Sequence, residues 1–138
     1  MIDNMNPEIW GNSFWEVIHL IGYNYSDYPS DDDKKNTRDF FDLIGLLLPC
    51  EKCRAHYKNH MITYSLTDND LINKNTLFTW TINLHNVVNL SLNKKHLTEK
   101  NVIDRYIHKK KYDNKNIFII LLLILILILL VVILKIKK

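Results

Sequence analysis

The sequence predicts an all-α protein: a four-helix bundle with a short fifth helix, followed by a C-terminal transmembrane helix. Apolar residues recur at the three- and four-residue spacing of helices, and no stretch keeps the two-residue alternation of a strand. Glycine and proline, which interrupt helices, occur only three times each. Residues 117–134 form an unbroken apolar run. As a helix this run would extend about 27 Å, close to the hydrocarbon thickness of a bilayer.

The first two helices have recognisable start signals. A helix is expected over residues 7–23, because Pro7 suits a first turn and Pro29 lies beyond the end of the pattern. A second helix is expected from Ser30, a favourable N-cap, and the three aspartates after it suit the positive end of the helix dipole. The residues expected to face inward are Trp10, Phe14, Val17 and Ile21 in the first helix and Phe40, Phe41, Leu43, Ile44 and Leu47 in the second.

Proline and polar residues separate the remaining helices. Pro49 interrupts the second pattern, and a third helix is expected from there through Cys50 to about residue 61. Residues 63–75 are polar and predict a loop, and a fourth helix is expected over residues 76–92. The stripes of the first four helices can bury a common core. A short fifth helix is expected after Thr98, with its inward side formed by Val102, Ile103, Tyr106 and Ile107.

The chain is expected to divide into a helical domain (1–108), a basic juxtamembrane linker (109–116), a transmembrane helix (117–134) and a basic tail (135–138). A segment that is apolar on every side has no place in so small a core, so a single-pass C-terminal membrane anchor is expected. The start of the chain lacks the basic and apolar regions of a signal peptide, and more basic residues precede the apolar run than follow it. The helical domain is therefore expected in the cytosol.

Net charge argues against one class of function. The chain carries 18 Lys and Arg and 15 Asp and Glu, and three of the lysines follow the apolar run. The part before the run is therefore neutral overall, and its charge gives no indication of nucleic-acid binding. The basic residues 109–111 are interpreted as a solvated linker, with contact to anionic lipid heads as the alternative.

Both cysteines lie in the segment LPCEKCRAHY, residues 48–57. A lone C-x-x-C in a cytosolic setting is more often catalytic or metal-binding than structural. Pro49 predicts that Cys50 opens a helix, where backbone N–H groups favour the thiolate. Cys53 follows one turn later on the same face, within reach of a disulfide. We therefore expect a redox pair in which one sulfur is attacked from outside and the other lies deeper.

Two alternatives for this pair stay open. A zinc site would use Cys50, Cys53, His56 and His60, but on one helix these side chains spread along about 15 Å, too far for one tetrahedral ion. A purely structural disulfide is the second alternative. We expect no metal.

A redox pair needs an electron acceptor, and aromatic and imidazole side chains suggest where one would bind. Trp15 and His19 share a face of the first helix, and His85 and Asn89 share a face of the fourth, with Asn86 beside them. Each cluster alone is more typical of core packing. Together they are expected to line a slot for a planar aromatic cofactor between the helices.

Three separated motifs, in this order, resemble the Erv/ALR family of FAD-linked sulfhydryl oxidases: WGNSFWEVIH (10–19), LPCEKCRAHY (48–57) and WTINLHNVVN (80–89). The resemblance covers about residues 7–107. It implies a helical bundle that holds FAD beside the disulfide, with Cys53 nearest the flavin and Cys50 exchanging with incoming thiols. The residues that it implies for the FAD site are Trp15, His19, His56, His85, Asn86, Asn89, Lys94 and Tyr106.

The sequence departs from the family pattern at three points. Asn12 stands where the family often has arginine, Ile82 and about Glu99 stand where cellular members have a further cysteine pair, and an N-terminal shuttle C-x-x-C is absent. The small cysteine set, the short chain and the Asn/Lys/Ile-rich composition resemble the branch encoded by large DNA viruses. That branch implies a virion or a host internal membrane as the location.

The function implied by the resemblance is FAD-dependent thiol oxidation. Electrons would pass from a substrate dithiol to the Cys50–Cys53 disulfide, then to FAD and then to O2, giving H2O2. The expected partners are a thioredoxin-like dithiol carrier or other protein thiols, and the resemblance implies a homodimer. The alternative function is a non-enzymatic, tail-anchored adaptor whose cysteines are reduced or bound to zinc.

Overall fold

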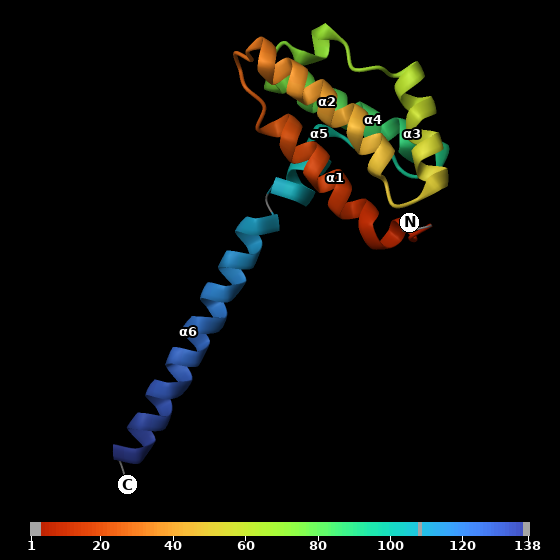
Figure 1. Ribbon diagram of the computed structural model, residues 1–138. Coiled ribbons are helices and arrows are strands. Elements are labelled where there is room, and N and C mark those ends of the chain that lie inside the picture. Colours follow the sequence, from red (N-terminus) through yellow and green to blue (C-terminus); the bar gives the residue numbers. More distant parts are fainter. Residues whose placement is uncertain (1–3, 108, 137–138) are drawn as a thin grey trace. The chain divides into compact units, whose positions relative to one another are not determined.

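Every regular element in the described part of the chain is a helix, as the sequence predicts. The computed structural model describes residues 4–107 and 109–136, and the chain divides into two compact units, Met1–Val102 and Ile103–Lys138. The elements of the first unit are α1 (Pro7–Tyr23), α2 (Asp31–Leu47), α3 (Glu51–Thr63), the 3-10 turn η1 (Asp68–Leu71), α4 (Lys74–Ser91) and α5 (Glu99–Val102) (Figure 1). The second unit contains the π-helical turn η2 (Ile103–Ile107) and α6 (Lys109–Ile136).

Local capping explains where the first helices begin. The side chain of Asn6 accepts a hydrogen bond from the Glu8 N–H at 3.0 Å, and Pro7 occupies the first turn of α1. Ser30 caps α2 in a capping box, in which the Asp33 carboxylate accepts from the Ser30 N–H at 2.9 Å. The predicted starts of both helices are confirmed.

The capping of α4 extends that helix beyond the prediction. Asn73 accepts hydrogen bonds from the N–H groups of Asn75 and Thr76, so the helix starts at Lys74 rather than at residue 76. The polar stretch before it, predicted to be a loop, contains η1.

α1 and α2 bury a partly different set of residues from the one predicted. Val17 is 48% exposed, Leu43 55% and Leu47 73%. The faces that are buried instead contain Ile18, His19 and Gly22 of α1 and Phe41, Ile44 and Gly45 of α2. The apolar spacing specifies a helix, but which flank of a broad apolar stripe is covered depends on where the neighbouring helix lies.

Gly22 shows how closely α1 and α4 pack. A Cβ added at Gly22 would lie 3.0 Å from the Cα of Phe78 and 3.0 Å from Cγ2 of Thr81. A side chain here would force α4 to shift, so glycine favours this close approach of the C-terminal half of α1 to the centre of α4. The buried core around it includes Phe41, Leu71, Leu77, Trp80 and Leu84.

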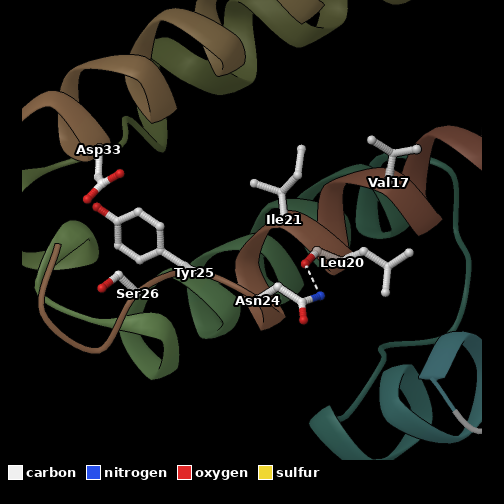
Figure 2. Close-up of a pocket in the computed structure, with 7 residues that line it drawn as sticks. All are labelled: Val17, Leu20, Ile21, Asn24, Tyr25, Ser26 and Asp33. Carbon is white, nitrogen blue, oxygen red and sulfur yellow. Dashed lines mark hydrogen bonds between the residues drawn. The ribbon is translucent and has the colours of Figure 1, made fainter.

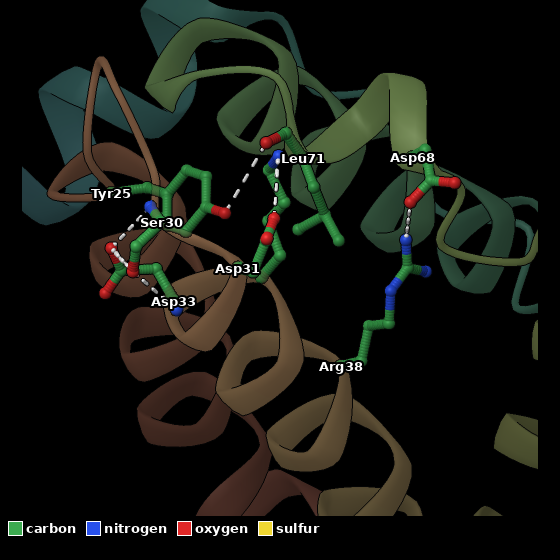
Figure 3. Close-up of polar contacts among 8 residues, drawn as sticks. Tyr25, Ser30, Asp31, Asp33, Arg38, Asp68 and Leu71 are labelled. Carbon is green, nitrogen blue, oxygen red and sulfur yellow. Dashed lines mark hydrogen bonds and ion pairs between the residues drawn. The ribbon is translucent and has the colours of Figure 1, made fainter.

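Polar contacts connect α2 to the segment that leads into α4 (Figure 3). Arg38 pairs with Asp68 and donates a second hydrogen bond to the Leu66 carbonyl at 2.9 Å. The Tyr25 hydroxyl donates to the Leu71 carbonyl at 3.5 Å. These contacts hold η1 against the bundle.

The second unit contains the apolar run. Residues Ile117–Lys135 of α6 form a 19-residue stretch with a mean hydropathy of 4.1, and none of the side chains described in it is buried. By length and composition this helix can cross a membrane. The segment expected to be a linker, residues 109–116, belongs to the same helix. The expected fifth helix is in fact the four-residue α5 followed by the π-helical turn η2.

Candidate functional site

The two cysteines form a disulfide at the N-terminus of α3, as their spacing predicts. Cys50 and Cys53 are bonded, with their Cα atoms 5.1 Å apart. Cys50 is the N-cap of α3, and its Sγ accepts a hydrogen bond from the Cys53 N–H at 3.1 Å. The same N–H and the positive end of the helix would stabilise negative charge on the Cys50 sulfur after reduction.

The N-terminal segment brackets Cys50 on both sides. The Met5 N–H donates to the Pro49 carbonyl at 2.9 Å, and the Glu51 N–H donates to the side chain of Asn4 at 3.4 Å. Met5 is held in turn by the Trp10 indole, whose N–H donates to the Met5 carbonyl at 3.2 Å. The first residues of the described chain thus fix the backbone of the redox turn.

A second anchor for this turn comes from α3 itself. The guanidinium of Arg54 donates to the Leu48 carbonyl at 2.6 Å. One turn later, the Tyr57 hydroxyl donates to the Phe41 carbonyl at 2.8 Å, and burial raises the pKa of this phenol. The Tyr57 ring lies against Gly45, where an added Cβ would come within 2.4 Å of it. Gly45 therefore lets α3 pack closely on α2.

The two cysteines differ in exposure. Cys50 is 7% exposed, whereas Cys53 is half-buried. Cys50 lies in the turn that residues 4–5 bracket, and Cys53 lies in the first turn of α3. Attack on the pair at Cys50 is implied by the family resemblance and stays a prediction.

The predicted aromatic and imidazole residues do come together between α1 and α4. The rings of Trp15 and His85 are stacked with their centroids 3.8 Å apart and an interplanar angle of 3°. His19, fully buried, stacks against both rings, with centroid distances of 5.8 Å to Trp15 and 5.2 Å to His85. Because Trp15 and His85 lie directly on each other, no planar ring fits between these two.

Hydrogen bonds set the tautomers of the two histidines. The Thr81 hydroxyl donates to the Phe78 carbonyl at 2.7 Å, so its oxygen must accept from Nδ1 of His19 at 3.1 Å. Burial lowers the pKa of His19 to about 4, so the ring is neutral near pH 7 and its Nε2 is an acceptor. His85 therefore donates from Nδ1 to this Nε2, at 2.9 Å.

Asn86 and Asn89 are buried near the end of α4, and both side chains form hydrogen bonds with backbone groups. Asn86 binds the backbone of Leu97, and Asn89 donates to the Lys95 carbonyl at 3.3 Å. Lys94, the next predicted residue, is exposed on the segment that these asparagines hold.

The remaining predicted residues are not brought into this cluster by any described contact. His56 is exposed on α3. Tyr106 belongs to the second compact unit, so its place in the site stays a prediction. Among the described residues, no group of three or more His, Cys, Asp and Glu side chains is placed to hold a metal ion. The cysteines are also joined to each other, which argues against the zinc alternative.

Sequence reasoning missed two residues that shape the site, Thr81 and Gly45, whereas it placed Trp80 beside the His85 cluster. The four-residue spacing from Thr81 to His85 was a signal, because it places both on one face of α4. The Trp80 ring packs edge-on against Phe41 at 4.7 Å, and its buried indole N–H has no acceptor among the described residues.

The chain also has a shallow groove of about 600 Å³ along the C-terminal half of α1, the α1–α2 connection and the first turn of α2 (Figure 2). Its lining contains none of the predicted site residues; it consists of Val17, Leu20, Ile21, Asn24, Tyr25, Ser26 and Asp33.

Comparison with known proteins places this geometry in a family. Residues 12–112 match the Erv1/Alr family. The chain belongs to the Erv1/Alr family. It is 38% identical over 119 residues to a probable FAD-linked sulfhydryl oxidase of Acanthamoeba polyphaga mimivirus, covering 84% of this chain and 83% of that protein. It is 33% identical over 113 residues to an FAD-linked sulfhydryl oxidase of African swine fever virus, covering 80% of this chain and 92% of the relative.

Solved structures agree with the fold. The crystal structure of the yeast Erv1 core superimposes with a TM-score of 0.65 at 22% sequence identity, covering 75% of this chain and 86% of that one. The FAD-binding domain of Erv1 from Saccharomyces cerevisiae gives a TM-score of 0.66 at 22% identity, covering 75% and 95%. The all-α, Erv1-like fold of the first unit is therefore confirmed.

Proposed function

We propose that this Erv1/Alr-family protein is an FAD-linked sulfhydryl oxidase that forms disulfide bonds in other proteins. The observation that carries the proposal is the Cys50–Cys53 disulfide at the N-terminus of α3, where a backbone N–H already contacts the Cys50 sulfur. Named viral relatives, matched over most of their length, support the same activity.

The residues present fit FAD. The Trp15–His85 stack offers an aromatic face for a planar ring, and the buried Trp80 N–H is a donor in need of an acceptor. Lys94 and Lys95 are exposed and are the nearest cations in sequence to the Asn86–Asn89 end of α4, suited to a diphosphate. When bound, FAD supplies a two-electron acceptor that O2 reoxidises, with H2O2 as the product.

The thiol chemistry follows from the disulfide. A substrate thiolate attacks the Cys50 sulfur, the Cys50–Cys53 bond breaks, and Cys53 leaves as a thiolate. A second substrate thiolate then attacks the substrate sulfur of the mixed disulfide. The substrate leaves oxidised, and Cys50 departs as a thiolate that accepts the Cys53 N–H. Two electrons have then moved to the cysteine pair, and the substrate's two protons have gone to solvent. Because residues 4–5 bracket the turn, the substrate must approach past them.

One variant tests this assignment. The purified full chain should be yellow, and Cys53→Ser should abolish thiol oxidation while leaving FAD bound. A colourless protein would support the adaptor alternative. Unchanged oxidation by Cys53→Ser would contradict the proposed route through the pair.

The cellular setting is proposed from the second unit and the viral relatives. The apolar stretch Ile117–Lys135 supports a single-pass C-terminal anchor, with the catalytic domain cytosolic, in a virion or host internal membrane. Carbonate extraction tests membrane insertion, and protease protection tests orientation. With one cysteine pair in the chain, a thioredoxin-like dithiol carrier is the proposed thiol partner.

A homodimer is also proposed, through the outer face of α1. Val17 is half-exposed there, and the apolar side chains of Leu20 and Ile21 line the groove beside it. Sedimentation of the full chain in detergent should give two copies per particle, and Val17→Lys should shift it to one.

A further inference from the structure

Asn86 holds a chain segment through both ends of its side-chain amide. Its Oδ1 accepts from the Leu97 N–H at 2.7 Å, and its Nδ2 donates to the Leu97 carbonyl at 2.9 Å. The side chain thus copies the pairing that one strand residue makes with its neighbour. Asn86 is only 6% exposed and Leu97 is half-buried, so both bonds are partly shielded from water. Turning Asn86 toward any ligand would break both bonds at once.

Asn89 reinforces the same segment from one turn further along α4. Its Nδ2 donates to the Lys95 carbonyl at 3.3 Å, and its own carbonyl accepts from the Lys94 N–H at 2.8 Å. The Asn93 N–H donates to the Leu90 carbonyl at 3.2 Å, and Asn93 has a φ of 53°. This is a Schellman ending with a left-handed residue after the cap. It reverses the chain, so that residues 94–97 return along α4.

The segment held in this way is basic. It carries Lys94, Lys95 and His96 in succession, all exposed, and the sequence from residue 71 to residue 98 contains no Asp or Glu. Neither lysine forms an ion pair within the described residues. Clustered cations without a carboxylate partner suit an anionic ligand, and the diphosphate of FAD is the anion that the proposed function supplies.

We propose that Asn86 and Asn89 are positioning residues, not cofactor contacts: they fix the basic segment 94–97 on α4 so that its lysines meet the FAD diphosphate. This inference rests on the proposed function for the identity of the anion. We call the hydrogen bonds from Asn86 and Asn89 to residues 94–97 the clamp, and these bonds depend only on the chain itself. It predicts that loosening Asn86 frees the segment even when no FAD is bound.

Amide exchange and cofactor release together test the clamp in the full chain in detergent. In the FAD-free protein, Asn86→Ala should speed exchange of the Leu97 amide by about tenfold or more, because two partly buried hydrogen bonds are lost. In the FAD-loaded protein, the same variant should speed FAD release by about tenfold, measured as the rise in flavin fluorescence.

Two further variants separate the clamp from direct contact. Asn86→Asp keeps the acceptor for the Leu97 N–H but loses the donor. Its rates of Leu97 exchange and FAD release should therefore lie between those of wild type and Asn86→Ala. If Asn86→Ala does not fold, Asn86→Asp takes its place in the test. The Lys94→Ala/Lys95→Ala double variant should speed FAD release without changing Leu97 exchange. Asn83→Ala is the matched control: an exposed asparagine on the same helix, expected to change neither readout.

Faster FAD release in Asn86→Ala with unchanged Leu97 exchange would show direct contact and overturn the proposal. Faster exchange with unchanged release would also overturn it, because the segment would then not serve the cofactor. A wild-type chain that takes up no FAD would refute the proposed function and, with it, the role of the lysines. The exchange measurement would still decide whether Asn86 clamps the segment.

Discussion

Thr81→Val tests the hydrogen-bond chain that links α1 to α4. The Thr81 oxygen accepts from Nδ1 of His19, and both residues are fully buried. Valine has nearly the shape of threonine but no oxygen, so packing against Gly22 is kept while the Nδ1–H of His19 loses its acceptor. The ring can avoid an unpaired donor only if both histidines change tautomer together, so that Nε2 of His19 donates to Nδ1 of His85, and the buried Nδ1 of His19 then still lacks a partner at position 81.

The expected cost follows from this burial. A buried donor left without a partner costs about 1–3 kcal/mol, so Thr81→Val should lower the free energy of unfolding by about 2 kcal/mol. For a domain of about 100 residues this corresponds to a fall in Tm of about 10 °C. Thr79→Val is the control, since Thr79 is exposed on the same helix and should change stability by less than about 0.5 kcal/mol.

Chemical denaturation at pH 7 measures the stability difference, and nitrogen NMR of the histidine rings reads the tautomer directly. Wild type should show His19 and His85 both protonated at Nδ1. If Thr81→Val were as stable as Thr79→Val, or if wild-type His19 carried its proton on Nε2, the reasoning about this chain of bonds would be refuted.

Three other predictions concern pH, packing and access to the disulfide. Because the folded-state pKa of His19 is about 4 and its ordinary value is 6.5, the unfolded chain binds the proton first as pH falls. Stability should therefore drop by about 2 kcal/mol between pH 7 and pH 5 in denaturation experiments, and His19→Gln should remove most of that slope. Gly45→Ala should lower Tm by several degrees, because the new methyl group would meet the Tyr57 ring at 2.4 Å; an unchanged Tm would show that the ring shifts freely. Trp10→Phe removes the hydrogen bond to Met5 and should speed reduction of the disulfide by dithiothreitol about two- to threefold; a slower reaction would mean that the segment aligns the turn instead of shielding it.

The sequence predicts most helix boundaries because capping is local. Pro7 and Ser30 mark helix starts through atoms within three residues of themselves, and both starts are confirmed. The inward faces were harder to predict. Val17 and Leu47 fit the helical period, but both are exposed, because burial depends on the position of helices distant in sequence.

In the site, too, local contacts could be predicted from the sequence and long-range contacts could not. The pairing of Cys50 with Cys53 follows from a spacing of three residues and could be predicted. The bond from His19 to Thr81 joins residues 62 positions apart, and the bond from Asn86 to Leu97 depends on how a loop returns. Neither is visible in a local pattern. The motifs indicated that these residues matter, but not that Asn86 holds a backbone segment.

The most direct test of the account is anaerobic reduction of the full chain by dithiothreitol, with flavin absorbance at about 450 nm as the readout. The account predicts that wild type bleaches as two electrons pass through the Cys50–Cys53 pair, while Cys53→Ser stays yellow with dithiothreitol yet bleaches with dithionite. Bleaching of Cys53→Ser by dithiothreitol at the wild-type rate would contradict the central claim that this disulfide is the route to the flavin.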